Sequence, residues 1–210
     1  MSNCEIIKLN NLDIEPYQVT DVLRCLLHTI TFNRALGAVN PRDIDSELFT
    51  DLTWVTCGDK EVDASVESNV ATVQSWVDKN PGRQFQVRLG FFEKRQQQGW
   101  WFNKEQRLFW EQWIIPFSLQ DSLQEPAVES EIYRTKRKQA LQQQIKSCLV
   151  QIITVVNEKR DHIPPVVSGN ALTFPFEVTI EESTSESSSI FAADLIKRML
   201  SSTQPPSVLH

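Results

Sequence analysis

Two apolar runs that lie close together in the chain, residues 84–91 and 108–117, constrain the fold more than any other feature. The first run, QFQVRLGF, alternates polar and apolar residues with a period of two, which is typical of a strand with one buried face. The second run, LFWEQWIIPF, is rich in aromatic and β-branched residues, which favours a strand buried on much of both faces. We therefore predict two strands joined by the segment between them.

That connecting segment, residues 94–104 (KRQQQGWWFNK), places Trp100, Trp101 and Phe102 among polar residues, charged residues and a glycine. We predict a loop here, and loops run over the surface of a protein, where large apolar side chains are costly. The pattern leaves two explanations open. Either the loop folds back and the aromatic rings pack on the body, or the rings are kept for a partner, because buried aromatic anchors dominate the binding energy of interfaces.

The composition excludes several classes of protein. A chain of 210 residues fits one domain, or one domain with tails, and can bury a substantial core. Its net charge of −6 argues against nucleic-acid binding. No apolar run approaches the roughly 20 residues of a membrane span, and the N-terminus has no signal-peptide pattern. Four scattered cysteines without a CxxC pair predict neither a zinc site nor a disulfide framework, so a soluble, reducing compartment fits best.

The rest of the chain alternates between helical and extended patterns. Apolar residues at three- and four-residue spacing predict helices at residues 20–36, 60–79 and 132–160. Alternation predicts strands at residues 5–14, with an interruption at Asn10-Asn11, and at residues 48–56 and 171–180, with a turn at residues 40–43 between the first helix and the second strand. Pro175 confines the last strand to an edge or a bulge. Residues 181–189 (EESTSESSS) are predicted to be a linker, residues 190–200 regain helical spacing, and the last ten residues form a tail.

Motifs of enzymes and metal sites are missing from the sequence. None of GxxxxGK[ST], GxGxxG, HExxH or GxSxG occurs. Cys148 falls within the apolar stripe of the third predicted helix, which favours a buried, inert thiol. A nucleophile and base pair of Cys148 and His162 is an alternative, but no third group is indicated. We therefore predict an interaction protein with no catalytic residue, metal or cofactor, and His28 as a packed or surface histidine.

A basic cluster near the start of the third predicted helix offers a second functional hypothesis. Arg134, Lys136, Arg137 and Lys138 lie close together, and we interpret them as a solvated first turn. Contact with an acidic partner or an anionic membrane is the alternative. Combined with interfacial tryptophans in the loop, the cluster would suit a peripheral membrane-binding module, although the overall acidity of the chain weighs against it.

Four stretches carry a resemblance that covers nearly the whole chain: residues 22–30 (VLRCLLHTI), 101–102 with 107–113 (WF and RLFWEQW), 155–165 (VVNEKRDHIPP) and 174–180 (FPFEVTI). They resemble the plant-like branch of the autophagy-related protein 101 family. The resemblance implies an α+β HORMA domain, a mainly antiparallel sheet backed by three helices with a C-terminal safety-belt-like segment. It implies the following division of the chain: the HORMA domain at 1–180, the linker at 181–189, a C-terminal helix of the HORMA region at 190–200 and a disordered tail at 201–210.

The resemblance also implies a function. Members of this family are non-enzymatic adaptors in autophagosome formation, in the cytoplasm at the phagophore assembly site. They heterodimerise with and stabilise the HORMA domain of autophagy-related protein 13, in the kinase complex that initiates autophagy, and family geometry suggests the helix near residues 141–156 for this contact. An exposed Trp-Phe finger recruits downstream factors, and it matches Trp101 and Phe102. Animal members separate the two aromatics by one residue, so Trp100 is a second candidate, and which tryptophan faces outward stays open.

Overall fold

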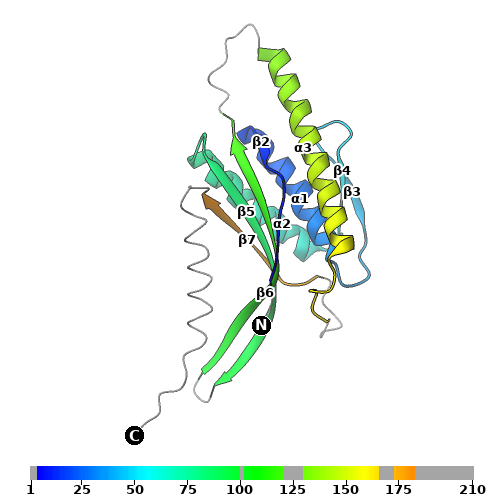
Figure 1. Ribbon diagram of the computed structural model, residues 1–210, viewed down its shortest axis with the longest axis vertical. Coiled ribbons are helices and arrows are strands. Elements are labelled where there is room, and N and C mark those ends of the chain that lie inside the picture. The colour runs from blue at the N-terminus through cyan, green and yellow to red at the C-terminus, as the bar shows by residue number, and fades with distance from the viewer. Residues whose placement is uncertain (1–3, 100–101, 121–129, 166–172, 183–210) are drawn as a thin grey trace.

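The computed structural model describes residues 4–99, 102–120, 130–165 and 173–182, with the backbone alone for residues 95–99, 102–105 and 130. Within these residues the protein is a mixed α+β structure, in which three α-helices accompany a mainly antiparallel sheet (Figure 1). The predicted α+β class is therefore confirmed at this level.

The main sheet is built from β1 (Glu5–Lys8), β2 (Leu12–Ile14), β5 (Gln84–Gly99), β6 (Phe102–Leu119) and β7 (Phe176–Glu182). The strand order is β1-β6-β5-β7, and β2 also pairs with β6. The β5–β6 and β5–β7 pairs are antiparallel, whereas β1 and β2 run parallel to β6. The interruption predicted within residues 5–14 is confirmed, because β1 and β2 are separate strands on the same neighbour.

The helices are α1 (Val19–Asn33), preceded by a 3-10 turn at Pro16–Gln18, α2 (Lys60–Lys79) and α3 (Ser130–Glu158). The α2 bounds agree with those predicted from sequence. Asp59 begins this helix by accepting hydrogen bonds from the backbone N–H groups of Glu61 and Val62, which satisfies two donors that have no partner within the helix. The other two predicted helices are also confirmed, with ends shifted by one to three residues.

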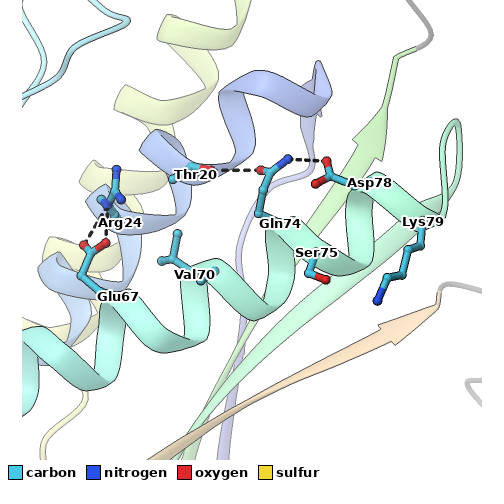
Figure 2. Close-up of a pocket in the computed structure, with 9 residues that line it drawn as sticks. Thr20, Arg24, Glu67, Val70, Gln74, Ser75, Asp78 and Lys79 are labelled. Carbon is cyan, nitrogen blue, oxygen red and sulfur yellow. Dashed lines mark hydrogen bonds and ion pairs between the residues drawn. The ribbon is translucent and has the colours of Figure 1, made fainter.

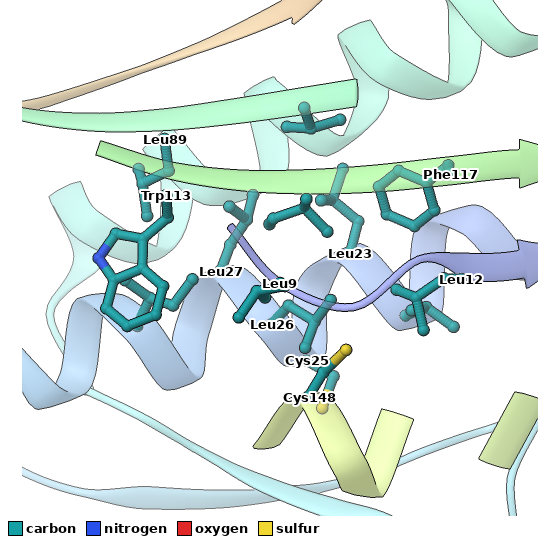
Figure 3. Close-up of a cluster of buried hydrophobic side chains, with 14 of the residues drawn as sticks. Leu9, Leu12, Leu23, Cys25, Leu26, Leu27, Leu89, Trp113, Phe117 and Cys148 are labelled. Atoms are coloured by element: carbon teal, nitrogen blue, oxygen red, sulfur yellow. The ribbon is translucent and has the colours of Figure 1, made fainter. Parts of the chain in front are cut away.

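The core lies between the helices and one face of the sheet (Figure 3). Leu23, Leu26 and Leu27 of α1 are fully buried there. They share the core with Leu89 of β5 and with Trp113 of β6. Alternate residues of β5 are buried in this way, which confirms the period of two that predicted the strand.

Helix α3 covers the outer edge of the N-terminal strands with amide side chains. Gln144 accepts a hydrogen bond from the backbone N–H of Asp13 at 3.0 Å, and Gln151 accepts one from Asn10 at 3.2 Å. Gln151 also donates to the carbonyl of Lys8 at 2.8 Å. These contacts satisfy backbone groups that an edge strand would otherwise leave unpaired.

The prediction for residues 40–56 is wrong in part. β3 (Arg42–Asp45) occupies part of the predicted turn, and it pairs with β4 (Thr53–Thr56), which is only the second half of the predicted strand. Residues 46–52 turn instead, because the hydroxyl of Ser46 accepts hydrogen bonds from the backbone N–H groups of Leu48 and Phe49. Such local side-chain bonds compete with extended structure.

Beyond residue 165, the chain is described only at residues 173–182, most of which form β7. This strand begins at Phe176, so the prediction is wrong for residues 173–175 and Pro175 lies just before the strand. Among the described strands β7 pairs only with β5, which agrees with the predicted edge position. β7 continues to Glu182, two residues into the segment predicted as a linker. The helix predicted at 190–200 and the tail at 201–210 lie outside the described residues.

Candidate partner-binding hairpin

The prediction of a loop at residues 94–104 is wrong. β5 continues through this segment to Gly99 and β6 begins at Phe102, with Lys94 opposite Arg107 and Gln98 opposite Asn103. The result is a long two-stranded ribbon that extends away from the helices (Figure 1). Antiparallel pairing continues outward from the buried part of the two strands through residues 94–98, which are all polar or charged. The sequence of this segment shows no alternation of polar and apolar residues that would have predicted the two strands.

The three predicted finger residues directly follow Gly99, the last residue of β5, in the sequence. Trp100 and Trp101 lie between Gly99 and Phe102 in the sequence and are outside the described residues. Phe102 is opposite Gly99 at the first position of β6, and its backbone alone is described. The directions of the three rings therefore stay a prediction.

The sheet narrows abruptly where the ribbon begins. β7 makes its last pair with β5 at Phe91, and β1 makes its first pair with β6 at Glu111, the residue opposite Phe91. The next pair along the ribbon is Phe92 with Phe109. Trp110 is thus the additional residue of a β-bulge, a feature that bends a strand and increases its twist.

Aromatic side chains fill the space around the bulge. The Trp110 ring lies with its centroid 5.5 Å from that of Phe91, 4.7 Å from Phe174 and 5.8 Å from His162. Only 4% of Trp110 is exposed. The segments that follow α3 and precede β7 therefore pack against the base of the ribbon.

Next to the bulge, Glu111 is a fully buried carboxylate with several partners. The guanidinium of Arg34, at the end of α1, donates to it at 2.7 to 3.1 Å. The indole N–H of Trp113 donates at 2.6 Å, and the Nε2 atom of His162 lies 2.6 Å from it. A buried charge is costly unless it is paired and hydrogen-bonded in this way. Sequence reasoning missed this cluster, although a lone carboxylate within an aromatic strand was a signal.

The residues considered for nucleophilic catalysis do not form a catalytic arrangement. Cys148 is buried, as predicted, and burial raises the pKa of its thiol to about 11, so the thiolate is disfavoured at neutral pH. The Cys148 Sγ atom lies 3.6 Å from the carbonyl of Asn10, whereas His162 contacts Glu111 and Trp110. His28 is also buried, and burial lowers the pKa of its imidazole. Across residues 4–99, 102–120, 130–165 and 173–182, no group of three or more His, Cys, Asp or Glu side chains is placed to hold a metal ion.

A hollow of about 450 Å³ lies between α1 and α2 (Figure 2). Several of its polar side chains are engaged with one another: Arg24 pairs with Glu67 at 2.7 Å. Thr20 donates to Gln74 at 2.9 Å, and Gln74 donates to Asp78 at 2.8 Å. The first two contacts join α1 to α2, whereas the third lies within α2, and none of them leaves a charged group directed into the hollow.

Helix α3 presents apolar side chains to solvent at both ends. Val150 and Ile153 are 64% and 51% exposed and lie one turn apart, on the side opposite the buried stripe that includes Ile152. Near the N-terminus of the helix, Ile132 and Tyr133 are 68% and 47% exposed. The basic residues predicted to be solvated there are exposed or half-buried: Arg134, Lys136, Arg137 and Lys138.

Among the described helices, none combines the length with the apolar character that crossing a bilayer requires.

Comparisons with known proteins agree with the resemblance seen in the sequence. The model of the family described as autophagy-related protein 101 matches residues 11–170. The chain is 39% identical to autophagy-related protein 101 of Arabidopsis thaliana, over 97% of this chain and 98% of the relative. The proteins of the same name from Schizosaccharomyces pombe and Xenopus laevis are 27% and 24% identical, over 86% of this chain in both cases and 86% and 84% of the relatives. These relatives support a role in autophagy and indicate no catalytic family. The chain belongs to the autophagy-related protein 101 family, in its plant-like branch.

Proposed function

We propose that this protein is a non-enzymatic adaptor in autophagosome formation with two separate binding surfaces. Its body forms a heterodimer with the HORMA domain of autophagy-related protein 13, in the kinase complex that initiates autophagy at the phagophore assembly site. The end of the β5–β6 ribbon recruits a downstream autophagy factor through Trp101 and Phe102, with Trp100 beside them.

The ribbon is the observation that carries the proposal. From the pair of Phe92 with Phe109 to the pair of Gly99 with Phe102, eight residue pairs extend beyond the last strand pairings with β1 and β7. A ribbon that serves only the fold has no need of this length, and two tryptophans at its turn are costly in water. Aromatic residues on a projecting element suit a pocket in a partner, where they act as binding anchors.

The outer face of α3 supports the other half of the proposal. Val150 and Ile153 make an apolar patch on the helix that the family resemblance assigns to the heterodimer. Apolar residues at the centre of an interface with polar residues around them are typical of stable complexes. The mixed sheet with its helices is compatible with a HORMA domain, the fold that both subunits of the proposed heterodimer would share.

The test of the finger is the double variant Trp101→Ala with Phe102→Ala. We expect this variant to unfold at the wild-type temperature and to bind the HORMA domain of autophagy-related protein 13 as the wild type does. It should lose the downstream factors that co-purify with the wild-type complex. If the variant is destabilised by the roughly 3–5 kcal/mol expected for deleting a buried aromatic side chain, the rings pack on the body and the finger does not exist.

The test of the docking face is the double variant Val150→Asp with Ile153→Asp. Because both side chains are exposed, we expect little change in the unfolding temperature and a loss of co-purification with autophagy-related protein 13. Thr72→Asp on the exposed side of α2 is the matched control and should keep the heterodimer. A heterodimer that survives both aspartates would place the interface elsewhere.

A second candidate function is a peripheral membrane-binding module. It is favoured by the exposed Ile132 and Tyr133 beside Arg134, Lys136 and Lys138 at the start of α3, because apolar and basic residues together suit an anionic lipid surface. Co-sedimentation of the purified protein with vesicles rich in phosphatidylserine tests this candidate. A protein that stays in the supernatant excludes it.

A further inference from the structure

We infer that the junction between the sheet and the β5–β6 ribbon is a fixed joint, in which Gly90 and Phe109, braced by Arg107 and Glu177, are positioning residues that hold the ribbon in one direction. The joint itself is a property of the fold. Its consequence, that the ribbon presents its turn to a partner at a set angle, rests on the function proposed above.

Gly90 is required by the ring of Phe109. A Cβ atom at Gly90 would lie 2.8 and 2.9 Å from two carbon atoms of that ring, well inside van der Waals contact. Gly90 pairs with Gln112 in the last part of the wide sheet, whereas Phe109 belongs to the first pair of the ribbon, opposite Phe92. The Phe109 ring therefore reaches back across the bulge and covers the glycine of the sheet.

Arg107 makes a second connection in the same direction. Its guanidinium lies 5.0 Å from the centre of the Phe92 ring and donates to the carboxylate of Glu177 at 2.7 Å. Glu177 belongs to β7 and pairs with Gly90, so this ion pair joins the ribbon to the edge of the sheet. Both side chains are substantially exposed, at 52% and 36%. Exposed ion pairs contribute little to stability. We therefore assign to this pair the role of fixing the direction of the ribbon relative to β7.

The bulge residue completes the joint from another direction. Trp110, next to Phe109 in the chain, packs against Phe174 and His162, and the backbone N–H of Phe92 donates to the carbonyl of Pro175 at 3.0 Å. An isolated two-stranded ribbon is marginally stable and twists strongly. A ribbon of this kind keeps one direction only if its first residue pair is held by contacts on several sides, as Phe92 and Phe109 are here.

The experiment measures the direction of the ribbon in the full chain by electron-spin distance measurements. Nitroxide labels are attached at Gln97→Cys in the ribbon and Thr72→Cys on α2, in a background carrying Cys4→Ser because the other three cysteines are buried. We expect one narrow distance distribution for the otherwise native chain. A broad distribution, as from a ribbon that swings, would overturn the inference.

Gly90→Ala is expected to move the mean distance or to broaden the distribution, because the new methyl group displaces the Phe109 ring. Adding Phe109→Leu removes the ring atoms that clash, so the mean distance should return toward that of the native chain, an outcome that simple destabilisation would not produce. The distribution should stay broader than the native one, because the ring that packs on Gly90 is gone. Unchanged distances in Gly90→Ala would overturn the inference.

If Gly90→Ala fails to fold, the variant Arg107→Gln tests whether the joint is fixed. This variant is expected to broaden the distribution at an unchanged unfolding temperature, and an unchanged distribution would overturn the brace. None of these measurements involves a partner. Loss of recruitment in the Trp101 and Phe102 double variant therefore tests the proposed function, while the distances test the joint, and either can fail alone.

Discussion

The two halves of the β5–β6 pair are joined at the bulge, where the register shifts by one residue between Phe91 and Phe92, and they are held together by different interactions. Inside the sheet, Phe85, Val87 and Leu89 are completely buried and alternate with half-buried polar residues. Beyond Phe92, the pairing continues for seven more residue pairs without β1 or β7 alongside. Burial holds the first half in place, whereas the second half is held by the backbone hydrogen bonds between its two strands.

This difference separates stability from binding within one pair of strands. The buried half carries the free energy of folding, so its residues are constrained by packing. The ribbon can change its turn residues at little cost to the fold, which suits a segment that meets a partner. Substitutions on the sheet side of the bulge should therefore lower the free energy of unfolding, whereas substitutions at the end of the ribbon should affect binding and leave stability nearly unchanged.

The largest effect is expected for Glu111→Ala, at the end of the wide sheet. The substitution leaves Arg34, only 3% exposed, without its carboxylate partner, and breaking a buried ion pair from one side costs about 3–5 kcal/mol. Chemical denaturation measures the loss in the free energy of unfolding.

The matched control for this prediction is Glu67→Gln. It breaks the pair with Arg24, in which both side chains are at least a third exposed, and the expected loss is about 0–1 kcal/mol. Equal losses in the two variants would mean that Glu111 does not organise the base of the ribbon.

Leu89→Ala is expected to have the next largest effect, a loss of about 2–5 kcal/mol. Leu89 is fully buried in the core between β5 and α1, and its neighbours can close the resulting cavity only in part. Thermal and urea denaturation of the variant check the value. At temperatures where the variant is folded, the proposed recruitment of a downstream factor by Trp101 and Phe102 should be unchanged, because Leu89 lies on the sheet side of the bulge.

Secondary structure was predicted correctly from sequence where buried apolar residues recur at a regular spacing. The five valines of α2 (Val62, Val66, Val70, Val73 and Val77) are all buried, and their spacing predicted the helix with its observed bounds. The strand β3 was missed because all four of its residues are exposed, so no alternation exists to be read. The ribbon was missed because residues 94–98 are all polar or charged, so the sequence shows no alternation there. Its strands follow from pairing with each other, which is not a property of either segment alone.

The site divides in the same way. The chemistry of Trp100, Trp101 and Phe102 among polar neighbours singled out this segment, although its structure was predicted wrongly. The cluster around Glu111 was out of reach, since Arg34 and His162 are 77 and 51 positions away in sequence. Only the packing of α1 and of the segment after α3 brings the three together.

A smaller effect, confined to the body, is expected from pH. Burial lowers the pKa of His28 from its ordinary 6.5, while Asp63 and Glu67 of α2 oppose this shift and Arg24 of α1 adds to it. The unfolded chain therefore binds a proton more readily than the folded chain, and stability should fall as the pH drops below about 6.5. Urea denaturation between about pH 7.5 and pH 5.5 measures this dependence.

The variant that isolates this contribution is His28→Gln, for which the dependence on pH should be weaker. Burial raises the pKa of the Asp63 carboxyl, so the folded chain binds that proton more readily than the unfolded chain. This group therefore increases stability as the pH falls, opposite to His28. The comparison is therefore made between wild type and variant at each pH. Identical slopes would mean that His28 is not the group that titrates.

The smallest effect on stability is expected for a chain whose ribbon is cut short. Residues 96–105 are replaced by Asn-Gly, which joins the paired residues Arg95 and Gln106 through the two-residue turn that hairpins favour. The deleted positions pair only with one another among the described strands, so the free energy of unfolding should change by less than about 1 kcal/mol. Its dependence on pH should match that of the full chain, because His28 contacts the body alone. The shortened chain should still bind autophagy-related protein 13 and should lose the downstream factor. A large drop in stability would show that the end of the ribbon supports the fold, and the separation between the two halves of the strand pair would be lost.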